Sequence, residues 1–150
     1  MDNQAGVKDL LNSAIESVSQ VIPAATEVYP PKAFQQTTLQ SHMSVLVGIT
    51  GDVSGRVVLE GEGPTFSSLG ESMFGMPLQG EMLHSFVGEI ANMIAGTTSS
   101  ILSQKGRKID ITPPTVVVGT FQMFGFEQGI SVPIHIANVG EVNMILLLQK

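Results

Sequence analysis

The sequence contains no cysteine, and charged side chains make up only 13% of its 150 residues. The lack of cysteine excludes disulfide bonds and thiol chemistry. Apolar residues account for 43% of the chain, so a surface with so few charges indicates that a partner or a second copy of the chain covers part of it. The seven Lys and Arg residues are scattered and the net charge is −6. This argues against nucleic-acid binding, because no basic cluster is present to neutralise phosphates.

Long apolar runs are also missing. A helix that crosses a bilayer takes about 20 consecutive apolar residues, and no such stretch occurs. The N-terminus, MDNQAGVKDLLNS, carries acids and amides where a signal peptide has a basic and then an apolar region. We therefore expect a cytoplasmic protein that does not associate with membranes. Its length suits one compact domain spanning residues 1–150.

The longest amphipathic pattern in the chain lies at residues 79–106 and predicts one long helix, about 79–105. At about 100° per residue, one stripe of it is almost wholly apolar and is expected to be buried: Leu83, Phe86, Val87, Ile90, Ile94, Thr97 and Ile101. The opposite side is expected to face solvent and carries small and polar residues: Ser85, Gly88, Glu89, Asn92, Gly96 and Ser99. Such a bare helix face predicts a surface that another macromolecule can approach closely.

Two further helices are predicted on the N-terminal side of the long one. Residues 4–22 repeat apolar side chains at helical spacing, and Pro23 ends the pattern because it cannot continue a helix. Residues 61–75 form a shorter helix, with Pro64 near its first turn and Gly75 at its end.

Strand patterns occupy most of the remaining sequence. The predicted strands are 36–40, 43–50, 56–60, 109–111, 116–118, 130–136 and 142–148, and residues 120–126 are either a strand or an edge loop. The sequence GDVSG predicts a hairpin turn between the second and third of these strands. Pro133 lacks the N–H that a ladder needs, so its strand is predicted to be bulged or at an edge. This order of elements indicates an α+β fold with helices on one face of a sheet.

Common catalytic and cofactor-binding patterns are not found. The three His residues lie too far apart for a spaced metal-binding motif, and no GxSxG or SxxK pattern supports a serine nucleophile. No Gly-rich loop matches a nucleotide fingerprint, and the eight Met residues and the stretch 121–126 are interpreted as core or dimer surface. On residue types alone, Glu89 and Asn92 indicate only an exposed helix face, because most Glu-x-x-Asn pairs on helices are merely solvated.

The pattern S-x-x-x-E-x-x-N at residues 85–92, followed by the proline pair at 113–114, resembles the signature of the CheC/CheX family of chemotaxis phosphatases. The segments GEIANMIAG and DITPPTVVVG are more similar to CheX than to CheC. CheC-type members typically carry two helices with the Glu-x-x-Asn pattern, and this chain has one copy, which also resembles CheX. The hairpin GITGDVSGRVVLE also resembles this family, so the likeness runs from about residue 41 to the C-terminus. The family's proline falls one position beyond Pro114, which leaves open whether Pro113 or Pro114 corresponds to it.

The resemblance implies an antiparallel-rich α+β fold of the CheC/CheX type and a phosphatase that hydrolyses the phospho-aspartate of a CheY-like response regulator. Asn92 would orient the attacking water, and Glu89 would pair with the Lys of the receiver domain. Ser85, Gly88 and Gly96 would lie at the docking surface, although Gly96 fits close packing against a neighbouring strand about equally well. The resemblance also implies no cofactor of the protein's own, with Mg²⁺ supplied by the phosphorylated receiver, and a homodimer in which strands of one subunit continue the sheet of the other.

One alternative is kept open: a non-catalytic docking or adaptor module of the same fold that binds a receiver domain or a flagellar switch component. Fold alone does not separate this module from the enzyme. Asn92 is the feature that favours the enzyme, since a helix used only for docking has no particular need of an amide at that position.

Overall fold

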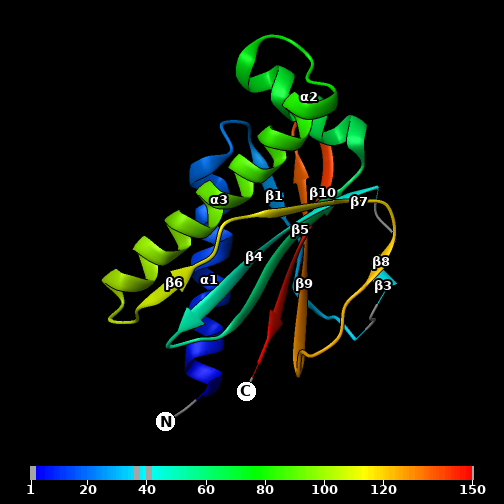
Figure 1. Ribbon diagram of the computed structural model, residues 1–150. Helices are drawn as coiled ribbons and strands as arrows, with labels where there is room; N and C mark the ends of the chain where they lie inside the picture. Colours follow the sequence, from blue (N-terminus) through cyan, green and yellow to red (C-terminus); the bar gives the residue numbers. More distant parts are fainter. Residues whose placement is uncertain (1–2, 36–37, 40–41, 150) are drawn as a thin grey trace.

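The computed structural model describes residues 3–35, 38–39 and 42–149, and it consists of an antiparallel sheet with helices on one face (Figure 1). The helices are α1 (Asn3–Val21), α2 (Gly63–Phe74) and α3 (Gly80–Gln104). The large buried cluster contains side chains of all three helices and of the sheet face beneath them. A smaller buried cluster on the other face holds only strand and loop side chains. The predicted α+β fold with one long helix is therefore confirmed.

Eight strands form the main sheet, and neighbouring strands in it are antiparallel. In chain order they are β1 (Thr26–Val28), β2 (Lys32–Ala33), β4 (Met43–Gly51), β5 (Gly55–Gly61), β6 (Ile109–Ile111), β7 (Thr115–Val118), β9 (Gln128–Ile136) and β10 (Gly140–Leu148). The hydrogen-bonded order is β1-β9-β10-β5-β4-β6, with β2 also on β9 and β7 also on β4. The short strands β3 (Thr38–Leu39) and β8 (Phe121–Gln122) pair with each other and pack on the face without helices.

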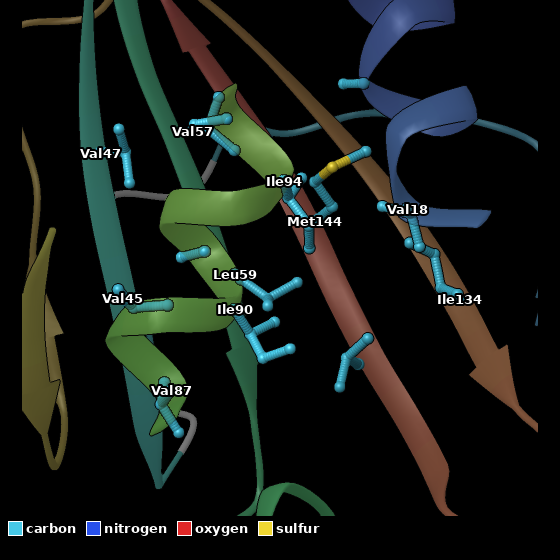
Figure 2. Close-up of a cluster of buried hydrophobic side chains, with 14 of the residues drawn as sticks. Val18, Val45, Val47, Val57, Leu59, Val87, Ile90, Ile94, Ile134 and Met144 are labelled. Atoms are coloured by element: carbon cyan, nitrogen blue, oxygen red, sulfur yellow. The ribbon is translucent and has the colours of Figure 1, made fainter. Parts of the chain in front are cut away.

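Helix α3 is held to the sheet by the apolar stripe that its periodicity predicts. Val87, Ile90 and Ile94 pack on side chains of strands β4, β5 and β10 (Figure 2): Val45, Val47, Val57, Leu59 and Met144. Thr97 is the exception in the predicted stripe, because it is only half-buried while Thr98 is 1% exposed. The prediction for Thr97 is wrong because α1 packs along the Thr98 flank of the helix and widens the buried side there.

Helix α1 is tied to α3 by polar contacts as well as apolar ones. The hydroxyls of Ser17 and Thr98 both donate to the carbonyl of Ile94, at 2.6 and 2.7 Å. Just beyond the end of α3, Arg107 forms an ion pair with Asp9 of α1, with 2.7 Å between Nε and Oδ2. These contacts hold α1 beside α3 on the same face of the sheet (Figure 2), and the side of α3 away from the sheet faces solvent.

Strand β9 is neither an edge strand nor bulged, contrary to the prediction made from Pro133. It lies between β10 on one side and β1 and β2 on the other, and its register with β10 is continuous from Gln128 to Ile136. The carbonyl of Pro133 accepts a hydrogen bond from the N–H of Tyr29 at 3.0 Å. Since the N and O of one strand residue face the same side, the missing donor of Pro133 points toward the break between β1 and β2, and pairing with β10 is unaffected.

The shorter elements follow their sequence signals. Helix α2 has Pro64 at its start, and Gly75 ends it in the left-handed conformation (φ 80°) with its N–H donated to the carbonyl of Glu71 at 2.8 Å. Of the strand predicted at 36–40, Thr38–Leu39 forms β3, whereas residues 36–37 and 40 lie outside the described residues. Within the stretch 120–126, where strand and loop were both open, Phe121–Gln122 forms β8.

Candidate active site on helix α3

One stripe of α3 faces away from the sheet. It holds residues spaced alternately three and four apart, which places them on one side of a helix: Met82, Ser85, Glu89, Asn92 and Gly96. Met82, Ser85 and Glu89 are exposed, and Asn92 and Gly96 are half-buried. The structure therefore brings four of the five predicted site residues, all except Gly88, onto one continuous strip of surface.

Glu89 and Asn92 are the polar groups of this stripe that carry a charge or an amide. Residues three apart on a helix are neighbours, with their Cβ atoms about 5–6 Å apart. Among the residues that the structure describes, neither side chain takes part in a hydrogen bond or an ion pair. One carboxylate and one neutral amide thus stand side by side, both available to a molecule that approaches this side of the helix.

Gly88 does not face solvent as the sequence analysis expected. It is buried, and a Cβ added to it would meet Pro114 Cγ and Val116 Cγ2, each at 3.6 Å. The prediction is wrong because the segment that leads from β6 into β7 lies directly against α3 at this position. Of the two prolines left open, Pro114 is the one that packs on the helix, one residue before Glu89, while Pro113 is exposed.

Gly96 is different, because a Cβ added there would meet nothing within 4 Å. The alternative that Gly96 serves close packing against a neighbouring strand is therefore wrong for this chain. Gly96 lies one turn beyond Asn92 on the same stripe, so the surface beside Asn92 is free of side-chain bulk on that side.

A shallow apolar groove of about 740 Å³ adjoins the stripe where α2 meets α3. Its lining consists of Phe74, Met76, Leu78, Glu81, Met82, Ser85, Phe86 and Glu89. Phe74, Met76 and Met82 are 63%, 54% and 60% exposed, so of the two interpretations of the Met residues, core or dimer surface, core does not apply to Met76 and Met82. The sequence held one signal for this groove: helical spacing puts Met82, an apolar residue, on the polar side of α3.

In the described part of the chain, no group of three or more His, Asp or Glu side chains is placed to hold a metal ion. None of the described helices combines the length and the apolar character needed to cross a bilayer.

A family model described as chemotaxis phosphatase CheX matches residues 43–135. The chain belongs to the CheX family. A curated relative, CheY-P phosphatase CheX of Thermotoga maritima, is 28% identical over 116 residues, which is 75% of this chain and 75% of the relative.

Two solved structures show the same fold as this CheX-family chain. A chemotaxis protein CheX from Desulfovibrio desulfuricans superposes with a TM-score of 0.80 at 22% identity, over 95% of this chain and 97% of the other. The CheX–CheY–BeF3–Mg²⁺ complex from Borrelia burgdorferi superposes with a TM-score of 0.78 at 21% identity, over 96% and 97% of the two chains. At these identities the likeness establishes the CheX fold.

The family match and the candidate site coincide in this CheX-family chain. Residues 43–135 run from β4 through most of β9, so they contain α3, Pro114 and the groove, whereas α1 and β10 lie outside the matched range. The structural likeness covers nearly the whole chain. The CheX fold thus includes α1 and β10, and these two elements hold α3 and the centre of the sheet in place.

Proposed function

We propose that this CheX-family chain hydrolyses the phospho-aspartate of a CheY-like receiver domain and so ends the signal of a chemotaxis or related two-component pathway. The observation that carries the proposal is the pair Glu89 and Asn92, which stand unpaired on the solvent-facing stripe of α3 in a chain of this family. The curated relative in Thermotoga maritima, which is named a CheY-P phosphatase, supports the same activity.

Hydrolysis of the phospho-aspartate requires the enzyme mainly to position the attacking water. An acyl phosphate has a good leaving group, so a water in line with it attacks phosphorus, the bond from phosphorus to the aspartyl oxygen breaks, and a free carboxylate and inorganic phosphate result. The amide carbonyl of Asn92 accepts a hydrogen bond from this water and holds it in line. An uncharged amide suits the position because it does not repel the phosphoryl oxygens.

Glu89 has a different part in the proposed complex. A carboxylate is repelled by a phosphoryl group unless a cation lies between them, so we assign Glu89 to an ion pair with a Lys of the receiver. Ser85 and Gly96, which lie one turn to either side of the Glu89–Asn92 pair, are assigned to the docking surface. Gly88 is reassigned from the docking surface to the packing of α3 against Pro114 and Val116, because its own position is buried.

We further infer that Mg²⁺ enters the site bound to the receiver. The CheX–CheY–BeF3–Mg²⁺ complex from Borrelia burgdorferi supports this origin for the ion. Bound there, the ion would supply charge stabilisation at the phosphoryl oxygens. The stripe of α3 offers one carboxylate and one amide, which fits contact with a partner's loaded site better than an ion cage of its own.

The function is tested by the loss of phosphate from ³²P-labelled CheY-type receivers, with wild-type protein and with the Asn92→Ala and Glu89→Ala variants. We expect Asn92→Ala to lower the rate constant of hydrolysis by about 100-fold while binding is retained, because only the water loses its partner. Glu89→Ala is expected to weaken binding and hydrolysis together. Asn12→Ala, which removes an exposed amide from α1, is the matched control and is expected to behave as wild type.

Three outcomes of this experiment decide between the hypotheses. Acceleration by the wild type that Asn92→Ala loses supports the phosphatase. Binding of a receiver without any acceleration by the wild type supports the non-catalytic docking module instead. Equal acceleration by the wild type and Asn92→Ala shows that another residue orients the water.

A further inference from the structure

The groove between α2 and α3 is the largest concentration of exposed apolar side chains in the described part of the protein. Six large hydrophobic side chains are substantially exposed among the described residues of the whole chain. Three of these six, Phe74, Met76 and Met82, line this one groove. Contiguous apolar surface of this kind usually marks an interaction site. The ring of Phe74 also packs edge-on against Phe86, with centroids 5.8 Å apart. This contact fixes the position of the Phe74 ring, so this wall of the groove is preformed.

The groove is continuous with the solvent-facing stripe of α3 that holds Glu89 and Asn92. Ser85 and Glu89 belong to its lining, and Met82 lies on the same side of α3 as Asn92. From Met82 to Asn92 is ten residues of helix, or about 15 Å. A standard protein interface covers about 800 Å² on each partner, which corresponds to a disc of about 16 Å radius. A receiver that brings its phosphoryl group to Asn92 is therefore large enough to reach the groove as well.

The chemistry of the lining narrows what can occupy it. Its apolar wall comes from Phe74, Met76 and Met82, and its charged groups are the carboxylates of Glu81 and Glu89, with no Lys or Arg among the lining residues. Methionine side chains are flexible and polarizable, and they adapt to an apolar group of irregular shape. The groove thus fits an apolar side chain flanked by a basic one.

We propose that the groove docks an apolar side chain on the surface of the phosphorylated receiver, next to its phosphorylation site, and that this contact sets the affinity of the complex. The identity of the partner rests on the proposed function, whereas the place of contact follows from the groove itself. The contact then adds to the affinity that the Glu89 ion pair supplies, without taking part in the chemistry. Met76 and Met82 hold the receiver, and Asn92 orients the water.

The test combines binding and kinetics on the whole protein. Binding is measured by titrating receivers held in the activated state with BeF3⁻ and Mg²⁺, and hydrolysis is measured with the same receivers carrying phosphate. The double variant Met76→Gln with Met82→Gln keeps the side-chain length and removes the apolar surface, and both positions are exposed enough for the fold to tolerate it. We expect Kd and KM to rise by about tenfold, because an apolar side chain of the partner loses its burial, while kcat stays at the wild-type value.

Phe124→Gln is the matched control, because Phe124 is 67% exposed and lies outside the groove lining. Its Kd and KM are expected to equal those of the wild type. Equal affinity of the Met76/Met82 double variant and the wild type overturns the inference. A change in oligomeric state of the double variant also overturns it, because the groove would then be covered by a second copy of the chain.

The failure of the inference is distinguishable from the failure of the proposed function. If the wild type binds a receiver but hydrolyses nothing, the phosphatase proposal fails, and the double variant still decides by its Kd whether the groove is the docking site. If the wild type binds no activated receiver, the receiver is the wrong occupant and the inference fails with it.

Discussion

At the scale of single residues, Glu89 and Asn92 are close in space, yet their surroundings suit different tasks in the proposed reaction. Glu89 is exposed, so the surrounding water weakens its attraction for a cation until docking excludes that water. Asn92 is half-buried, so its amide has less rotamer freedom to lose when it holds a water. We therefore expect Glu89 to act mainly on docking and Asn92 mainly on the chemical step.

A second residue-scale prediction concerns the ion pair that ties α1 to the end of α3. The hydrogen bond from Arg107 lowers the pKa of Asp9 below its ordinary value of 3.8, against a smaller opposing effect of desolvation. A lowered pKa in the folded state means that the stabilisation is present above 3.8 and is lost as the pH falls through the lower folded value. We expect Arg107→Gln to be less stable than the wild type near pH 7, with the difference shrinking from about pH 5 downward.

Urea unfolding at a series of pH values measures this difference. Lys108→Gln removes a positive charge from the neighbouring position, whose side chain is exposed, and is the matched control. It is expected to show no comparable dependence on pH. A stability difference for Arg107→Gln that stays constant from neutral to acidic pH would contradict the role assigned to the Asp9 carboxylate.

At the scale of elements, α3 shows what a sequence pattern does and does not contain. The apolar spacing predicted the helix, its length and nearly all of its buried stripe, because those depend on residues within the helix. The burial of Gly88 was not predictable in this way, because it is set by Pro114, a residue of a later segment, and glycine has no side chain to indicate a side. The groove was missed for a similar reason, since it forms only where two helices meet at a corner.

Gly96 offers a prediction that separates folding from docking. Space around its Cβ position is open, so Gly96→Leu is expected to raise the free energy of unfolding by about 0.8 kcal/mol through helix propensity alone. The same side chain would stand one turn from Asn92 on the docking stripe and keep the receiver away. We therefore expect a more stable protein that binds the activated receiver at least about tenfold more weakly, a loss of about 1.4 kcal/mol.

Gly96→Ala is the control for that prediction, because it gains at least as much helix propensity as Gly96→Leu but adds only one methyl group. Thermal unfolding and a binding titration on both variants make the comparison. Binding by Gly96→Leu at the wild-type affinity would show that the receiver does not approach this part of α3, and Gly96 would then leave the docking surface.

At the scale of the whole molecule, the order of the strands decides which of them lie at the edges of the sheet, and no local sequence pattern contains that order. Pro133 predicted an edge strand by itself, but β9 ended up inside the sheet because β1 and β2 are interrupted beside the proline. The sheet has two edges, one formed by β1 and β2 and the other by β6 and β7. β6 and β7 both pair with β4, and within the described residues no strand pairs with their outer side. Exposed edges of this kind are usually covered, and this is the edge that we propose for a homodimer with a continuous sheet.

The geometry of β7 allows this edge to be blocked without breaking the fold. The N–H of Gly119 donates to the carbonyl of His42 at 2.9 Å, on the side of β4. Because N–H groups alternate sides along a strand, the N–H of Val118 points outward, and its side chain is 56% exposed. Val118→Pro removes that outward donor and leaves the pairing of β7 with β4 intact.

We expect the wild-type protein to sediment as a dimer and Val118→Pro as a monomer, with closely similar circular dichroism. Val118→Thr keeps the N–H and the β-branched shape, so it is expected to remain dimeric and serves as the matched control. Dimers of Val118→Pro would mean that the subunits meet through another surface. A monomeric wild type would mean that the β7 edge is left open. In either case the apolar, weakly charged surface predicted from the composition would need a different cover, and the groove beside α3 would be the next candidate, since it holds three of the most exposed apolar side chains.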